Sequence, residues 1–199
     1  MSEAKVDSGR RTWIAITCGA GAVGGAAVAV PFISSFAPSE RAKAAGAPVQ
    51  VDISNLRPGE KMTVEWRGKP VWVVRRTEEQ VASLQKTEPL VADPFSKRNP
   101  AELTPEYARN VPRSIKPEVF VCVGICSHLG CSPVDKFTPG AQPSLPDDWQ
   151  GGFLCPCHGS TFDMAGRVFK NKPAPDNLEV PRHMYVSDTV LLIGEDSKG

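Results

Sequence analysis

The sequence predicts a mostly β protein carried on a single N-terminal membrane-spanning helix. Residues 13–36 contain no charged side chain, short runs of β-branched and aromatic residues recur from residue 49 onward, and glycine and proline make up 36 of the 199 residues. A composition rich in glycine and proline is typical of short strands and tight turns rather than of a helical bundle. With 41% hydrophobic and 23% charged residues, the chain can bury an ordinary folded core.

The uncharged segment 13–36 is long enough to cross a membrane. Its 24 residues would span roughly 36 Å as a helix, against a hydrocarbon core of about 30 Å. Arg10 and Arg11 precede it directly, and positive residues tend to stay on the cytoplasmic side. The run Ser8–Ile14 also resembles a twin-arginine export signal, which serves proteins that fold around a cofactor before export. We therefore expect a cytoplasmic N-terminus over residues 1–12 and an uncleaved anchor; a cleaved signal peptide is the alternative.

Residues 37–48 are polar and rich in alanine, and they join the anchor to the rest of the chain. Twelve extended residues could reach about 40 Å. We expect a flexible hinge here, although a passive spacer would have the same composition.

The remaining residues, 49–199, predict a domain of short strands. Runs of β-branched and aromatic residues between turn signals indicate the strands, at Val49–Ser54, Lys61–Trp66, Pro70–Arg76, Val119–Ile125 and Thr189–Ile193. A short helix is expected over Glu78–Lys86. Six prolines between residues 89 and 117 predict a segment that wraps over the surface.

Two short clusters hold four of the six cysteines and two of the three histidines. One cluster is Cys126-Ser127-His128-Leu129-Gly130-Cys131, and the other is Cys155-Pro156-Cys157-His158-Gly159-Ser160. Zinc could bind two cysteines and two histidines, but that site gives no role to the other two cysteines. A framework of disulfides leaves both histidines unexplained. A [2Fe–2S] cluster with mixed cysteine and histidine ligation is the third interpretation.

These two clusters, 23 residues apart, resemble the motifs of the Rieske iron–sulfur subunits of bacterial quinol–cytochrome c oxidoreductases, the cytochrome bc complexes. The twin arginines, the single anchor, the segment Arg113–Pro117 and the Pro173-Ala174-Pro175 loop resemble the same family. The resemblance implies a Rieske domain over residues 49–199. Its fold would be an antiparallel β-sandwich with an inserted cluster-binding subdomain at about residues 120–175.

The resemblance also implies a role for each motif residue. Cys126 and Cys155 would ligate the inner iron of one [2Fe–2S] cluster, and His128 and His158 the outer iron. The remaining expected roles are a Cys131–Cys157 disulfide, cluster shielding by Leu129 at the quinol site, a hydrogen bond from Ser160 to a bridging sulfide, and a lid that contains Pro173. The chain departs from the family at Phe162, where many members carry a tyrosine whose hydroxyl bonds a ligand sulfur. We expect this departure to lower the reduction potential.

The function implied by the resemblance is that of the iron–sulfur subunit of a quinol–cytochrome c reductase in respiratory or photosynthetic electron transport. His158 would take a proton from quinol while the cluster takes one electron, which then passes to a c-type cytochrome. The expected partners are cytochrome b, the c-type cytochrome, quinol and the membrane, in a dimeric multisubunit complex. The cluster domain would lie on the periplasmic side of a bacterial inner membrane.

Three other interpretations remain at this point. The chain could be the small Rieske subunit of an exported oxidase such as arsenite oxidase, a soluble Rieske-type ferredoxin, or a zinc-stapled interaction domain, which would be colourless. The net charge of +1 argues against nucleic acid as a partner. Outside the clusters, we expect Cys122 to be a buried thiol, Trp149 to pack within a loop, and His183 to lie in solvent.

Overall fold

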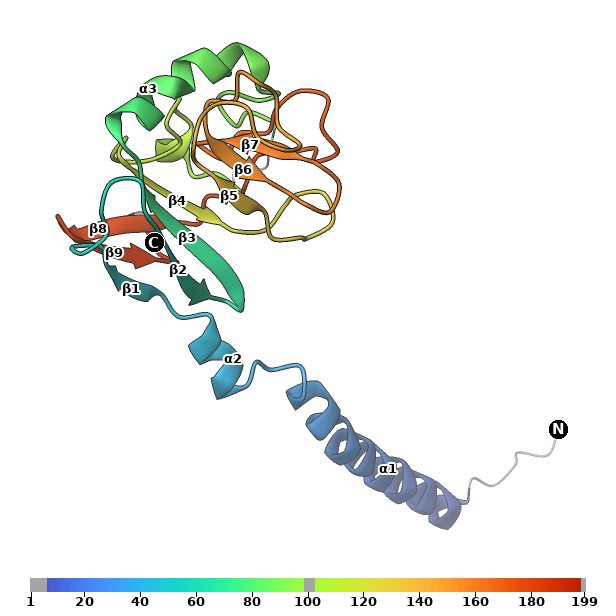
Figure 1. Ribbon diagram of the computed structural model, residues 1–199. Coiled ribbons are helices and arrows are strands. Elements are labelled where there is room, and N and C mark those ends of the chain that lie inside the picture. The colour runs from blue at the N-terminus through green and yellow to red at the C-terminus, as the bar shows by residue number, and fades with distance from the viewer. Residues whose placement is uncertain (1–6, 99–102, 198–199) are drawn as a thin grey trace. The chain divides into compact units, whose positions relative to one another are not determined.

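The computed structural model describes residues 7–98 and 103–197 (Figure 1). The chain divides into a first unit that ends at Ala44 and a second unit that begins at Ala45. The second unit contains every strand, so the predicted mostly β fold class is confirmed.

The first unit is dominated by α1, Ser8–Ser34. The side chain of Asp7 caps it by accepting a hydrogen bond from the Arg10 amide, 3.2 Å away. None of its residues is buried, and the helix is long and apolar enough to cross a membrane. It starts five residues before the predicted segment and ends two residues before its end. A second helix, α2 (Glu40–Ala45), lies within the expected hinge, and whether residues 37–48 bend there stays a prediction.

The second unit is built on a base of two three-stranded antiparallel sheets. One has the order β1-β9-β8, with β1 at Val49–Asp52, β9 at Val190–Ile193 and β8 at His183–Ser187. The other has the order β2-β3-β4, with β2 at Lys61–Trp66, β3 at Lys69–Arg75 and β4 at Val119–Val123. In Figure 1 the last two strands, β8 and β9, lie beside the first strand, β1. The base therefore joins the beginning and the end of the second unit.

Strand β3 contributes to two cores because successive side chains of a strand point to opposite faces. Val71 and Val73 face the base core, together with Val51, Ile53, Leu191 and Ile193. Trp72 and Val74 face a second core, which we call the loop-side core, together with Phe120, Phe153 and Phe162. Trp72 stacks on Phe153 there, with ring centroids 5.2 Å apart.

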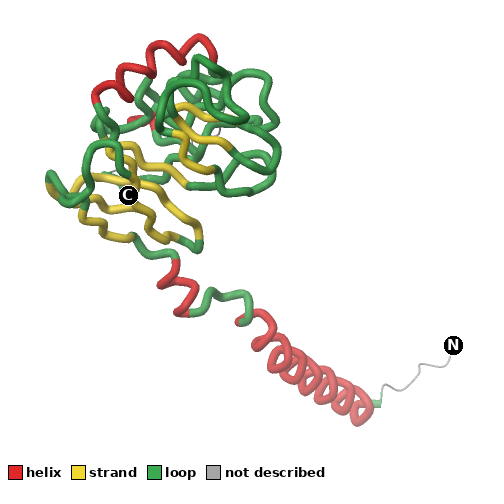
Figure 2. Tube along the Cα trace, in the orientation of Figure 1, coloured by secondary structure: helices red, strands yellow, loops and turns green. Residues whose placement is uncertain are grey.

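The loop subdomain, residues 124–180, packs against strands β3 and β4 through the loop-side core. Its sheet has the order β5-β6-β7, with β5 at Val134–Lys136, β6 at Gly152–Leu154 and β7 at Thr161–Asp163. Loops surround these short strands (Figure 2). Before β4 the chain forms α3 (Glu78–Thr87), η1 (Glu88–Leu90) and η2 (Glu106–Ala108). A capping box between Thr77 and Gln80 starts α3, where the sequence predicts a helix.

Candidate metal centre

Two loops of the subdomain have the same hydrogen-bond pattern. In the first loop, between β4 and β5, the Cys126 carbonyl accepts from the Gly130 amide at 3.1 Å, and the Cys126 amide donates to the Cys131 carbonyl at 2.8 Å. In the second, between β6 and β7, Cys155 makes the same two bonds with Gly159 and Ser160, at 3.0 and 2.7 Å. Both glycines have positive φ, 81° and 73°, a conformation that glycine adopts without strain. The two cysteine–histidine clusters are therefore presented in the same way.

The expected ligands converge where these loops meet. Cys126 and Cys155 are each only 2% exposed and are free thiols in contact with one another. The rings of His128 and His158 lie 4.8 Å apart, centroid to centroid, at 90°. His158 is exposed and His128 is half-buried. The two thiols are therefore buried, and the two imidazoles lie nearer the surface.

One atom in this group tests whether a metal fits. Nδ1 of His128 is buried and has no hydrogen-bond partner among the described residues, and such an orphaned buried atom is uncommon in proteins. An imidazole nitrogen is a donor suited to iron or zinc. Burial raises the pKa of the Cys126 thiol, while hydrogen bonds from the His128 backbone and the Ser160 hydroxyl oppose that rise. The residues therefore fit a centre whose positive charge stabilises the thiolates.

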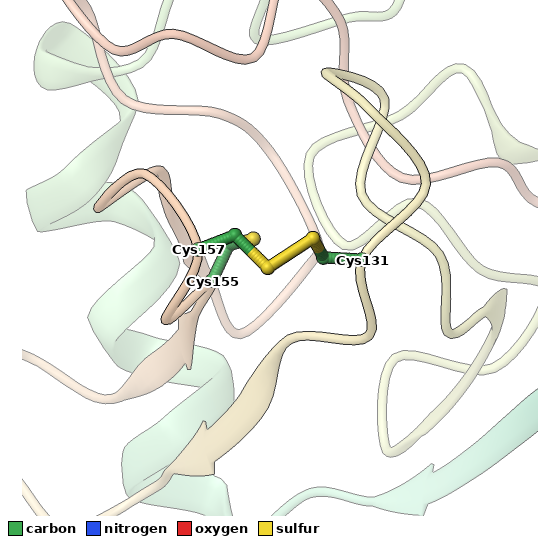
Figure 3. A group of neighbouring side chains, drawn as sticks. All are labelled: Cys131, Cys155 and Cys157. Carbon is green, nitrogen blue, oxygen red and sulfur yellow. A yellow bond between two sulfur atoms is a disulfide. The ribbon is translucent and has the colours of Figure 1, made fainter.

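Figure 3 shows three cysteines of the site, Cys131, Cys155 and Cys157, whose sulfurs lie within 4.8 Å of one another. Cys131 and Cys157 form a disulfide across 26 residues of chain, as expected. Two of the three sulfurs are thus committed, so this trio cannot bind a metal as a unit. Of these three sulfurs, only that of Cys155 remains available as a ligand. The disulfide joins one loop to the other.

The expected lid is bonded to both loops. The Ala174 amide donates to Ser160 Oγ at 3.0 Å. Ser127 Oγ donates to the Asp176 carbonyl at 2.6 Å and accepts from the Asp176 amide at 3.3 Å. Pro173, in the same lid, is exposed. The lid therefore depends on one serine from each loop.

Leu129 and Phe162 occupy opposite environments. Leu129 follows His128 in the first loop and is 70% exposed. Phe162 is fully buried and pairs with Phe153 across β6 and β7. An exposed leucine at the loop tip is available for contact with a partner, whereas Phe162 is part of the core.

The remaining expectations have mixed outcomes. Cys122 is fully buried, and burial raises its pKa to about 12, as a packed thiol requires. Trp149 is buried and donates from Nε1 to the Lys136 carbonyl at 2.8 Å, so its packing role is confirmed. The expectation for His183 is wrong, because this residue is 2% exposed.

His183 is buried because it joins two segments. Its Nδ1 lies 2.8 Å from the Pro181 carbonyl, and its amide donates to Tyr107 Oη at 2.8 Å. Burial lowers its pKa. Sequence reasoning missed this because Tyr107 is 76 residues away along the chain.

Comparison with known proteins gives two family matches. Residues 98–182 match the Rieske [2Fe–2S] domain family. Residues 1–39 match the export-signal family of the ubiquinol–cytochrome c reductase Fe–S subunit.

Individual relatives agree with these matches. The ubiquinol–cytochrome c reductase iron–sulfur subunit of Allochromatium vinosum is 54% identical over 94% of this chain and 88% of its own length. The subunit of the same name from Bradyrhizobium diazoefficiens is 40% identical over 93% of this chain and 94% of its own length. A chain of a solved hyperthermophilic respiratory Complex III is 26% identical, with a TM-score of 0.47, and the match covers 89% of this chain and 98% of that one.

Proposed function

This chain belongs to the family of ubiquinol–cytochrome c reductase iron–sulfur subunits, and from that premise we propose which of its residues hold the cluster that takes one electron from a quinol and which residue takes one proton. Its cofactor is a Rieske [2Fe–2S] cluster, and its activity is that of an oxidoreductase subunit. The relatives do not favour the alternative of an exported oxidase such as arsenite oxidase.

We assign the inner iron to Cys126 and Cys155 and the outer iron to His128 and His158. The observation that carries this assignment is the pairing of two buried thiols with two imidazoles, one of which has an orphaned buried Nδ1. Because the two loops share one hydrogen-bond pattern, we assign Nδ1 of both rings to the iron. The bound cluster supplies a one-electron acceptor at about −150 to +300 mV, well above the roughly −400 mV of plant-type ferredoxins.

The exposed histidine then has a free nitrogen at the surface. We assign Nε2 of His158 as the group that accepts the quinol hydroxyl proton, because His158 is exposed while His128 is half-buried. A neutral imidazole is a suitable base near neutral pH. Leu129, 70% exposed beside it, would exclude water by packing on the quinol ring. The lid, held by Ser127 and Ser160, keeps solvent from the thiol side.

The location follows from the N-terminal segment. The apolar helix and the export signal fit a membrane-anchored bacterial subunit. We infer that the N-terminus, residues 1–12, is cytoplasmic, that residues 13–36 form the anchor, and that the head from residue 49 onward is periplasmic. Arg10 and Arg11 lie in the first turn of α1, and positive residues tend to stay on the cytoplasmic side. Residues 37–48 would be the hinge on which the head moves between a quinol site on cytochrome b and a c-type cytochrome, within a dimeric complex.

The assignment of His158 is tested by spectroscopy on the complex purified from membranes through a tag on this chain. The unchanged protein should contain acid-labile sulfide, haem-bearing partners and a reduced-state paramagnetic signal of mixed nitrogen and sulfur ligation. His158→Gln should lose the signal and quinol oxidation, whereas His183→Gln, a change at a buried histidine outside both cluster motifs, should keep the signal. A normal signal and full turnover in His158→Gln would overturn the assignment.

A further inference from the structure

The turn that follows β7 is held by three buried arginines. We call residues 163–167 the arginine turn. Its Met164 carbonyl accepts from Arg76 Nη1 at 3.2 Å, and its Ala165 carbonyl accepts from Arg113 Nη1 at 2.9 Å. Arg167 pairs with Asp163 within the turn, with Nη2 and Oδ2 2.7 Å apart. Guanidinium groups from three parts of the chain therefore converge on five consecutive residues.

The charges at this point do not cancel. Arg76, Arg113 and Arg167 are at most 2% exposed, yet the Arg167–Asp163 pair is the only fully buried ion pair within residues 7–98 and 103–197. Asp93, which is also buried, accepts instead from the amides of Lys97 and Arg98.

Within the described part of the chain, Arg76 and Arg113 donate their hydrogen bonds to neutral oxygens. Arg76 donates to two carbonyls and the Ser114 hydroxyl. Arg113 donates to the hydroxyls of Ser96 and Thr104 and to three carbonyls, at Ala165, Gly166 and Leu178.

Both groups nevertheless remain cations. Burial lowers the pKa of Arg76 to about 9 and that of Arg113 to about 10, and each value lies above neutral pH. Buried Asp163 attracts both guanidinium groups, and buried Asp93 attracts that of Arg113. These two carboxylates leave one of the three guanidinium charges of Arg76, Arg113 and Arg167 uncompensated, which is costly inside a protein unless further negative charge shares the interior.

The proposed ligand thiolates supply further negative charge in this interior. Met164 and Ala165 of the arginine turn lie in the loop-side core that also contains Cys126 and Cys155. β7 joins the second ligand loop to the arginine turn within a few residues. Charges within one dry core interact at an effective dielectric constant of about 20, far below that of water.

We propose that the buried guanidinium groups of Arg76 and Arg113 act as fixed counter-charges that favour the reduced state of the cluster. This inference rests on the proposed function. Two thiolates and two neutral imidazoles make the oxidised centre neutral overall, and the one electron taken from quinol makes it one unit more negative. Fixed positive charges in the same core stabilise that added charge, so the two arginines set the potential without touching the cluster.

The test separates charge from hydrogen bonding by redox titration of the membrane-bound complex at one pH, followed through the reduced-cluster signal. Arg76→Gln and Arg113→Gln remove a charge. Ser114→Ala and Thr104→Val each remove one hydrogen bond from the same arginines but leave the charge. Arg57→Gln, at an exposed side chain, is the surface control.

Each Gln variant should lower the ratio of reduced to oxidised cluster at a fixed ambient potential by about threefold to tenfold, and tenfold corresponds to about 59 mV for a one-electron couple. The two hydrogen-bond variants and the surface control should stay within twofold of the unchanged protein. Equal shifts in Ser114→Ala and Arg76→Gln, or no shift in the Gln variants, would overturn the proposal.

A further variant covers a loss of folding. If a Gln variant holds no cluster, Arg76→Lys keeps a cation and decides the matter: a ratio within twofold supports the proposal and a threefold fall contradicts it. Absence of the mixed-ligand signal in the unchanged protein would instead refute the proposed function.

Discussion

The base and the loop subdomain of the head are stabilised in different ways. The base has strands of four to seven residues around a core of valine, isoleucine and leucine. The loop subdomain has three strands of three residues each. It relies on one disulfide, on lid bonds from Ser127 and Ser160, and on buried arginines.

This difference indicates that the two regions have different structural roles. Apolar packing tolerates substitution of similar volume, so the base can serve as a platform. Cross-links and buried polar bonds fix positions closely but fail when one partner is removed. The loop subdomain therefore has the precision that four metal ligands need, and it depends on each cross-link more than the base does.

Removal of the disulfide should separate the two regions most clearly. In Cys131→Ser with Cys157→Ser we expect a loss of about 2–5 kcal/mol in the stability of the loop subdomain, because its loops are no longer joined. Amide hydrogen exchange should show fast exchange in β5, β6 and β7, while β2, β3 and β4 stay protected. The cluster should also be lost during purification.

Cys18→Ser, in the membrane helix, is the control for a change of cysteine to serine. Equal loss of protection in the base and in the loop subdomain would show that they unfold as one unit, and the contrast drawn above would then be incorrect.

A hydroxyl added beside the ligand loops should change the potential without changing the base. Phe162→Tyr places a donor at the position where the family resemblance implies a tyrosine bonded to a ligand sulfur. Such a charge-assisted hydrogen bond stabilises the reduced state by about 1.5 kcal/mol, or roughly 60 mV for a one-electron couple. Redox titration should therefore give a higher midpoint potential. Phe169→Tyr, outside both ligand loops, should leave it unchanged, and a potential that is unchanged or lower in Phe162→Tyr would contradict the explanation.

The same contrast explains what the sequence could predict. The strands β1 to β4, strand β9 and helix α3 were expected within about two residues of their observed ends, because their apolar patterns reflect their own burial. Strand β8 was missed, and so were the three shortest strands, β5, β6 and β7, with the sequences VDK, GFL and TFD. Three residues carry no periodic signal, and their pairing depends on the tertiary structure.

The site shows a similar division. The proposed ligand residues stood out because cysteine and histidine at such spacing have few structural uses. The burial of Arg76, Arg113 and Arg167 was not identifiable, since arginine is among the residues that are seldom buried. Their partners include carbonyls up to 88 residues away along the chain, and no local pattern marks a carbonyl as an acceptor.

The smallest expected effect concerns His183, a buried titratable residue of the base. Its pKa in the folded state is lowered from 6.5 by burial, so the unfolded chain binds a proton at a higher pH than the folded chain does. The contribution of neutral His183 to stability is thus fully present above about pH 6.5 and declines as the pH falls toward the lowered value, by at most about 1.4 kcal/mol per pH unit.

Unfolding of the detergent-solubilised chain, measured from pH 7 to pH 5, should show a dependence of stability on pH whose slope is smaller in His183→Gln. Tyr107→Phe removes the hydroxyl partner but leaves the imidazole, so it should keep the slope at a lower overall stability. An identical slope in His183→Gln and the unchanged chain would contradict this prediction, because buried His183 would then contribute no acid sensitivity to the base.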